Sequence, residues 1–196
     1  FSSDEDIFDN LTFKITKDTH TTITGPNGSG KSTILGLLSG VFYPTNGNVS
    51  TFSDSYSYIG PTPLIFTSSL YENVMYGNKN VIDEKTILDL LRDLDIFKEE
   101  SNYDLTKIIS NKTLSSGQMQ KIAFVRALLN DSDILLLDEA TSNLDETTKD
   151  KIFKILKERK ITIVNSTHDP NSFKNVDHNL RIKLVDEKRI VDIHKL

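Results

Sequence analysis

The stretch GPNGSGKS, residues 25–32, is the feature that most constrains how this chain can fold. It fits the pattern G-x-x-x-x-G-K-[ST], in which glycines let the backbone wrap closely around phosphate oxygens. The alternating run 20–24 predicts a strand directly before it, and residues 32–40 predict a helix directly after it, with Gly40 as the stop. Because the pattern works between a strand and a helix, the sequence predicts an α/β fold with a site for a nucleoside triphosphate.

Within this phosphate loop, residues 25–32, different groups are predicted to hold different parts of the ligand. Backbone N–H groups and the helix N-terminus favour the negative phosphates. Lys31 is predicted to reach the β- and γ-phosphates, and Ser32 to offer its hydroxyl to Mg²⁺. A glycine-rich turn without a ligand is the alternative, and the flanking strand and helix argue against it. The predicted nucleotide-binding residues are Gly25, Pro26, Asn27, Gly28, Ser29, Gly30, Lys31, Ser32 and Thr33.

A second motif, ILLLDE at residues 134–139, supplies carboxylates. The apolar run 133–137 is typical of a strand buried on both faces of a parallel sheet. Asp138 stands at its end, where open α/β sheets place ligands, and is predicted to join Ser32 at the metal. Glu139 is predicted to accept a proton from an attacking water as the catalytic base. A solvated acidic strand end is the alternative, which the phosphate loop makes less favourable.

The remaining patterns predict one domain of 196 residues. A core of about 1–66 and 112–196 has a mainly parallel sheet flanked by helices, a helical subdomain covers about 67–111, and a small antiparallel β part is added. Helices are expected at 67–74, at 83–97 with Asp83 as N-cap, at 114–129 and at 147–159. Strands are expected at 11–15, 48–52, 56–60 and 161–165, and a terminal hairpin at 180–186 and 189–193.

Composition excludes several classes of function. The net charge of −5 does not favour a nucleic-acid partner, because binding phosphate backbones needs concentrated Lys and Arg. The chain has no cysteine, which rules out disulfides and thiolate metal sites. No apolar run approaches the roughly 20 residues that a helix needs to span a bilayer.

The order of further motifs points to a family. LSSGQMQKIAFVRALL (114–129) stands upstream of ILLLDEATSNLD (134–145), and NSTHD (165–169) follows. This order resembles the ATP-binding domain of ABC (ATP-binding cassette) transporters over nearly the whole chain. LSSGQ is similar to their signature motif, SNLD to their D-loop and His168 to their switch histidine, while SLYENVMYG (69–77) resembles the segment after the Q-loop in exporter-type members.

The resemblance implies a P-loop NTPase core and a mechanism. Two such domains pair head to tail around two ATP molecules with Mg²⁺, and His168 of each contacts the γ-phosphate. Residues of one copy then act across the dimer on the nucleotide held by the other: Ser115, Ser116, Gly117, Gln118 and Asp145. A helix N-cap is the structural alternative for Ser115, and the two roles are compatible. The implied partners are transmembrane domains, fused or separate, which places the domain at the cytoplasmic side of a membrane.

Some positions depart from the family pattern. Pro61 stands where the Q-loop glutamine is expected, and proline has neither a side-chain donor or acceptor nor a backbone N–H. Ser116 replaces the first glycine of the signature. Phe1 is the candidate for the ring that stacks on adenine, with Ser3 as the alternative alignment and no ring. The first strand that such domains usually have is expected to lie outside this sequence.

Two other functions are left open by these residues. Pro61 favours a regulatory module that binds ATP with little turnover, whereas Glu139 and His168 favour hydrolysis. A soluble ABC ATPase that acts on DNA would carry a long coiled coil between the phosphate loop and the signature. Here one small insert separates Ser32 from Leu114, and the acidic charge argues against nucleic acid.

Overall fold

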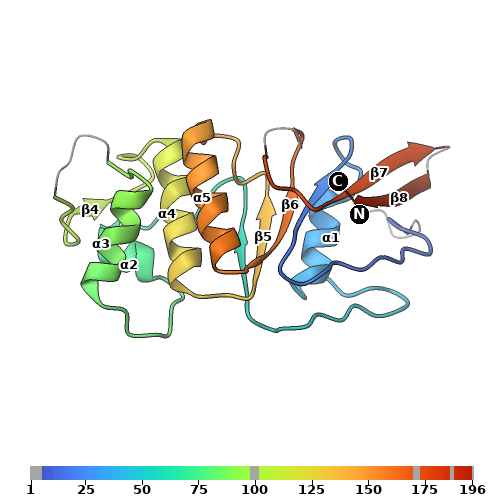
Figure 1. Cartoon of the computed structure of the whole chain (residues 1–196), viewed down its shortest axis with the longest axis horizontal. Coiled ribbons are helices and arrows are strands. Elements are labelled where there is room, and N and C mark those ends of the chain that lie inside the picture. The colour runs from blue at the N-terminus through green and yellow to red at the C-terminus, as the bar shows by residue number, and fades with distance from the viewer. Residues whose placement is uncertain (1–5, 98–101, 170–172, 186–187, 196) are drawn as a thin grey trace.

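The computed structural model describes residues 6–97, 102–169, 173–185 and 188–195, so Phe1 lies outside the described residues. A six-stranded sheet forms the centre, in the order β2-β5-β6-β1-β7-β8 (Figure 1). All neighbours in it are parallel except β7 and β8, which confirms the terminal hairpin. The strands are β1 (His20–Thr24), β2 (Tyr56–Ile59), β5 (Ile134–Asp138), β6 (Thr162–Ser166), β7 (His178–Val185) and β8 (Lys188–Lys195).

Helices cover both faces of the sheet. The central strands carry apolar side chains on both faces, and each face is buried against helices. Leu136 of β5 packs in a buried cluster with Ile34 and Leu35 of α1 (Lys31–Leu38). Leu135 and Leu137 belong to a larger cluster with α4 (Ser116–Leu129) and α5 (Glu146–Glu158). The helices α1 and α4 therefore lie on opposite faces of the sheet.

The insert contains α2 (Leu70–Met75), α3 (Glu84–Asp93) and an antiparallel pair, β3 (Ser68–Ser69) and β4 (Ile108–Ile109). Asp83 caps α3 as predicted, since the backbone N–H of Thr86 donates to its Oδ1 at 2.9 Å. The boundaries of the helical subdomain stay a prediction, because the larger apolar cluster is continuous from the sheet into the insert.

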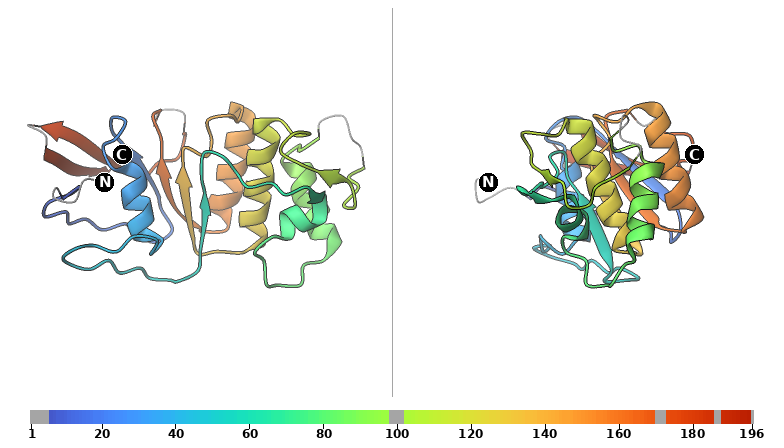
Figure 2. Two further views of the ribbon diagram at one scale, coloured as in Figure 1. Left: turned by 180° about the vertical axis from the view of Figure 1, so that it is seen from behind. Right: turned by 90° about the vertical axis from the view of Figure 1, so that its left-hand side faces the viewer.

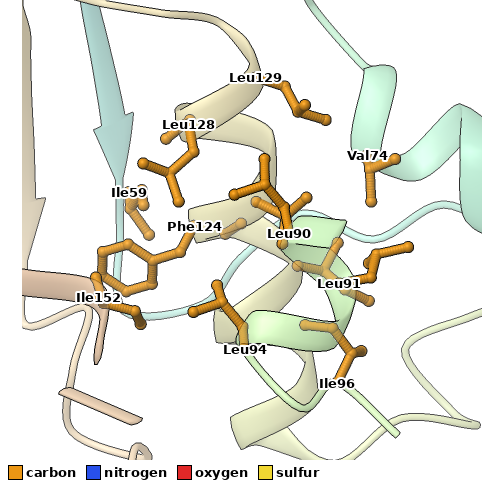
Figure 3. Close-up of a cluster of buried hydrophobic side chains, with 14 of the residues drawn as sticks. Ile59, Val74, Leu90, Leu91, Leu94, Ile96, Phe124, Leu128, Leu129 and Ile152 are labelled. Atoms are coloured by element: carbon orange, nitrogen blue, oxygen red, sulfur yellow. The ribbon is translucent and has the colours of Figure 1, made fainter. Parts of the chain in front are cut away.

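Figure 3 shows this continuity at Phe124 of α4. It lies beside Ile59 of β2 and Ile152 of α5, with Leu90 of α3 and Leu94, the residue that follows α3, in the same cluster. The Phe124 side chain is fully buried. Helix α4, which begins within the LSSGQ motif, is thus an element through which the sheet and the insert share one core.

Two predicted strands were wrong. Residues 11–15 form no strand; Leu11, Phe13 and Ile15 instead pack, half-buried, against the cluster around α1. Residues 48–52 also form no strand, and Val49 and Phe52 are exposed. Alternation alone cannot create a strand, because a strand needs a neighbour that accepts its backbone hydrogen bonds.

One edge of the sheet gathers the functional motifs. The carboxyl ends of the parallel strands and the N-termini of α1, α4 and α5 all lie at the top in Figure 1. Figure 2 shows the β7–β8 hairpin at one end of the long axis and α3 with β4 at the other. Among the described residues, no helix is both long and apolar enough to cross a membrane.

Candidate functional site

The phosphate loop curls around its own lysine. Lys31 is buried, and its Nζ donates to the carbonyl oxygens of Gly25 at 3.0 Å and Pro26 at 3.1 Å. Gly30, the N-cap of α1, has a φ of 101°. This positive φ favours glycine at position 30, and a Cβ atom there would also lie 2.6 Å from the ring of Phe8, which would have to shift.

Two polar side chains inside the phosphate loop, those of Ser29 and Lys31, can still form further hydrogen bonds. The side chain of Ser29 is fully buried, and within the described chain its hydroxyl has no hydrogen-bond partner. The ammonium of Lys31 has two carbonyl acceptors and can make a third hydrogen bond. A buried cation inside a ring of backbone groups favours an anion, and a phosphate group meets that requirement. The loop therefore fits the triphosphate that the sequence predicts.

Arg189 of β8 braces the loop from a distant part of the chain. Its guanidinium donates to the carbonyl oxygen of Gly28 at 3.4 Å and to that of Ile7 at 3.2 Å. The terminal hairpin thereby ties the loop to the segment before β1. Sequence reasoning missed this residue, because its role depends on the pairing of strands that lie far apart in the chain.

At the end of β5, Asp138 is buried and accepts a hydrogen bond from the hydroxyl of Tyr58 on β2, at 3.0 Å from its Oδ2. Burial, followed by the charge of Asp138, raises the pKa of Tyr58 to about 12, so the phenol stays protonated and donates. Tyr58 was also missed from sequence. Its signal is the register of β2 against β5, which no local motif reveals.

The predicted catalytic pair meets directly. Glu139 Oε1 lies 2.7 Å from His168 Nε2, and both side chains are partly exposed. Glu139 has a φ of 52°, and its backbone N–H donates to the carbonyl oxygen of Ser166 at 3.1 Å. This left-handed residue turns the chain out of the line of β5, so that its carboxylate and the imidazole that follows β6 share one edge of the sheet.

The signature motif forms the N-terminus of α4. The hydroxyl of Ser115 accepts from the backbone N–H of Gln118 at 3.2 Å, and Gln118 Oε1 accepts from the N–H of Ser115 at 2.8 Å. This capping box fixes the helix start. A Cβ on Gly117 would lie 2.9 Å from the carbonyl oxygen of Asn143, and Gln120 accepts from the N–H of Asn143. The signature and the D-loop therefore pack as one unit.

Asp145 ends that D-loop and caps α5, accepting from the backbone N–H of Thr148 at 2.8 Å. The signature stands on α4 and the phosphate loop on α1, which cover opposite faces of the sheet. The structure thus brings Asp138, Glu139 and His168 to one edge but does not join the signature to the loop of the same chain.

Metal ligands are sparse at this edge. Within the described ranges, no group of three or more His, Asp or Glu side chains could hold a metal ion by itself. A divalent cation here would need further oxygen ligands beyond Asp138 and Ser32. Phosphate oxygens of a nucleotide are such ligands, since Mg²⁺ is usually bound by one or two protein groups together with substrate phosphates.

Comparison with known proteins agrees with this geometry. The model of the ABC transporter family matches residues 8–142. The chain is 32% identical to ABC transporter B family member 13 of Arabidopsis thaliana over 81% of this chain and 14% of that protein. It is 34% identical to the lactococcin-A transport/processing ATP-binding protein LcnC of Lactococcus lactis over 95% of this chain and 28% of that protein. Antigen peptide transporter 2 of Homo sapiens is 34% identical over 72% of this chain and 23% of that protein.

Among solved structures, a bacterial Atm1-family ABC exporter with ATP bound matches the whole chain with a TM-score of 0.84 and 22% identity, over 36% of its own length. That likeness shows the fold. The chain spans less than a third of each of these curated relatives. Because the family model matches more than half of the chain and its nucleotide-binding motifs are in place, this chain belongs to the ABC transporter family and is an ATP-binding domain of it.

Proposed function

We propose that this domain binds Mg-ATP, pairs head to tail with a second such domain and hydrolyses ATP. The cycle would drive transport by membrane-spanning partners, with the domain at the cytoplasmic side of the membrane. The contact between Glu139 and His168 carries the proposal. This contact supplies a proton acceptor and a group that orients it. Both lie at the edge of the sheet formed by the carboxyl ends of the parallel strands, where the phosphate loop also lies.

Binding would rest on the phosphate loop and two flanking groups. The ammonium of Lys31 would turn from backbone carbonyls to the β- and γ-phosphates, where a full negative charge replaces a dipole. The hydroxyl of Ser32 and the carboxylate of Asp138 would hold the Mg²⁺ ion. When bound, that ion neutralises phosphate charge and helps to orient the reacting groups.

Hydrolysis would use water as the nucleophile. Glu139 accepts a proton from the water as its oxygen bonds to the γ-phosphorus, the bond from that phosphorus to the bridging oxygen breaks, and ADP and phosphate leave. His168 contacts the Glu139 carboxylate at 2.7 Å. In the proposed site it would hold this carboxylate and face the γ-phosphate. Such a positioned base typically contributes about 10²- to 10⁴-fold in rate.

A second copy would complete the site. Ser115 and Gly117 stand at the N-terminus of α4, where backbone N–H groups and the helix dipole favour an anion. They cannot serve the loop of their own chain, because α1 and α4 cover opposite faces of the sheet. Head-to-tail pairing lets one copy offer this N-terminus to the γ-phosphate of the other.

Glu139→Gln is the first test. Glutamine keeps the shape of the side chain but cannot take the proton, so we expect ATP affinity to stay near that of the parent and turnover to fall about 10²- to 10⁴-fold. Phosphate release and equilibrium ATP binding are the measurements. Lys31→Ala is the matched control, which should lose ATP affinity itself because the charge beside the phosphates disappears.

Hydrolysis by the glutamine variant at the parent rate would show that Glu139 is not the base. The regulatory alternative, favoured by Pro61, has a different signature. In that case the parent protein would bind ATP with the same dependence on Lys31 and release no phosphate above the background of the glutamine variant.

A further inference from the structure

The Tyr58–Asp138 hydrogen bond is a feature of the site that no motif accounts for. Tyr58 lies opposite Leu136 in the register of β2 and β5, so its ring projects from the same face of the sheet as Asp138. The phenol oxygen is 3.0 Å from Asp138 Oδ2. The aspartate is only 7% exposed, whereas Tyr58 is 47% exposed.

This hydrogen bond matters for the orientation of the carboxylate. Among the described residues, no other side chain or backbone N–H donates to the carboxylate of Asp138. A buried carboxylate held by one donor has one oxygen fixed and the other left available. Without the Tyr58 hydroxyl, the buried Asp138 carboxylate would have fewer hydrogen-bond partners and could rotate about its side-chain torsions.

The chain beyond β2 offers little to replace this donor. Pro61, two residues after the strand, has no polar side-chain atom and no backbone N–H. The Tyr58 hydroxyl is therefore the polar group that β2 itself brings to Asp138. The strand pairing fixes its place, so it does not depend on the conformation of the loop that follows.

We propose that Tyr58 is a positioning residue of the magnesium site, whose hydroxyl holds Oδ2 of Asp138 and leaves the other carboxylate oxygen for the ion and its waters. The inference rests on the proposed function, in which Asp138 serves Mg²⁺. Tyr58 acts through Asp138, so its removal should change how strongly Mg²⁺ supports nucleotide binding and leave metal-free nucleotide binding alone.

Tyr58→Phe is the minimal test, because it removes one oxygen atom and keeps the ring. Tyr56→Phe is the matched control: Tyr56 lies two residues earlier on β2, its ring is similarly exposed, and within the described chain its hydroxyl has no hydrogen-bond partner. The dissociation constant of the non-hydrolysable analogue β,γ-imido-ATP is measured on the full chain, first in EDTA and then across a Mg²⁺ titration.

We expect Tyr58→Phe to raise the Mg²⁺ concentration for half-maximal tightening by roughly 3- to 10-fold, the scale of one ordinary intramolecular hydrogen bond, because Tyr58 is partly exposed to water. Affinity in EDTA should stay at the parent value, and Tyr56→Phe should match the parent in both conditions. A Tyr58→Phe protein that loses affinity equally with and without Mg²⁺ would show a general packing role and overturn the inference.

Asp138→Asn separates failure of the inference from failure of the proposed function. If the asparagine variant keeps the full effect of Mg²⁺, the metal role of Asp138 is wrong, and the inference falls with it. If it loses that effect while Tyr58→Phe behaves like the parent, the metal site stands and the role of Tyr58 is refuted. In the double variant, Tyr58→Phe should add nothing, because its effect passes through Asp138.

Discussion

Some residues of this site matter because they have no side chain, and others because they supply a hydrogen-bond donor. Gly30 leaves space for the ring of Phe8, and Gly117 leaves space for the carbonyl oxygen of Asn143. Tyr58 and Arg189, by contrast, supply donors to groups from other strands and loops. At this scale the close approach of a neighbouring ring or backbone oxygen decides which positions tolerate a side chain.

Gly117→Ala tests that approach. Its Cβ would lie 2.9 Å from a backbone oxygen of the D-loop, which cannot swing aside as a flexible side chain can. We expect a loss of about 1–3 kcal/mol in the free energy of unfolding, as for other overpacked sites. Urea denaturation measures it. The control is Gly60→Ala, whose Cβ would meet Tyr58 at an ordinary 3.4 Å; equal stability of the two variants would contradict the packing argument.

Among the elements, α4 combines structural and functional roles most closely. Its N-terminus carries the capping box of Ser115 and Gln118, and Phe124 in its middle packs in the shared core. Arg126 near its end donates to the carbonyl oxygens of Asn73 and Leu64, which ties the helix to the insert and to the chain that leads into it. In the proposed dimer, a change at the signature could therefore act through the stability of the fold or through contact with the ligand of the other copy.

Substitutions of Ser115 separate these two roles. Ser115→Ala removes the cap and should lower the free energy of unfolding by about 1 kcal/mol. Ser115→Asp keeps a cap, because aspartate accepts the same backbone hydrogen bond, so stability should stay near that of the parent. Its negative charge would repel the γ-phosphate of a partner copy and abolish ATP-dependent pairing. Denaturation and sedimentation distinguish the variants, and normal pairing of the aspartate form would remove Ser115 from the phosphate site.

For the whole molecule, the arrangement of the motifs supports the proposed pairing. The loop and the signature lie on helices of opposite faces, so in the proposed dimer one copy would hold two incomplete halves of different sites. Polar faces of this kind associate weakly until a charged ligand completes them.

We therefore expect the Glu139→Gln protein to sediment as a monomer without nucleotide and as a dimer with Mg-ATP. Addition of the Lys31→Ala change, which removes nucleotide affinity, should return it to the monomer. A stable dimer in the absence of ATP would contradict a ligand-completed interface.

The loss of folding stability at acid pH is also a property of the whole fold, because it depends on the burial of His20. His20 begins β1, is buried and stacks on Phe153 with ring centroids 4.9 Å apart. Burial, outweighing a hydrogen bond that the imidazole donates to the backbone of Asn175 and the charge of Asp177, lowers the pKa of His20 to about 4. The folded protein thus keeps this imidazole neutral, while the unfolded chain takes up a proton near pH 6.5.

The stability contributed by neutral His20 is present above pH 6.5 and is lost as the pH falls toward 4. We expect the free energy of unfolding to drop by up to about 3 kcal/mol across that window from this residue. His20→Phe, which keeps an aromatic ring, should flatten the dependence, whereas the exposed His194→Gln should leave it unchanged. Urea midpoints at several pH values are the measurement; an unaltered slope in the phenylalanine variant would refute this account.

The sequence by itself determined the features that local patterns encode. The phosphate loop, the buried strands β5 and β6, the cap of α3 and the amphipathic helices all follow from spacing within a dozen residues. The roles of Lys31 and Asp138 were predicted from motifs, and the structure places both residues at the edge where such roles are possible.

Only the tertiary structure decided which groups meet. Three contacts join residues that lie on or next to different strands. They are the contact of Glu139 with His168, the hydrogen bond from Tyr58 to Asp138, and the hydrogen bond from Arg189 to the phosphate loop. The same dependence explains why residues 11–15 alternate like a strand and yet form none: side-chain pattern is local, but a backbone ladder requires a neighbour. Strand order and register are global properties, and they set the geometry of this site.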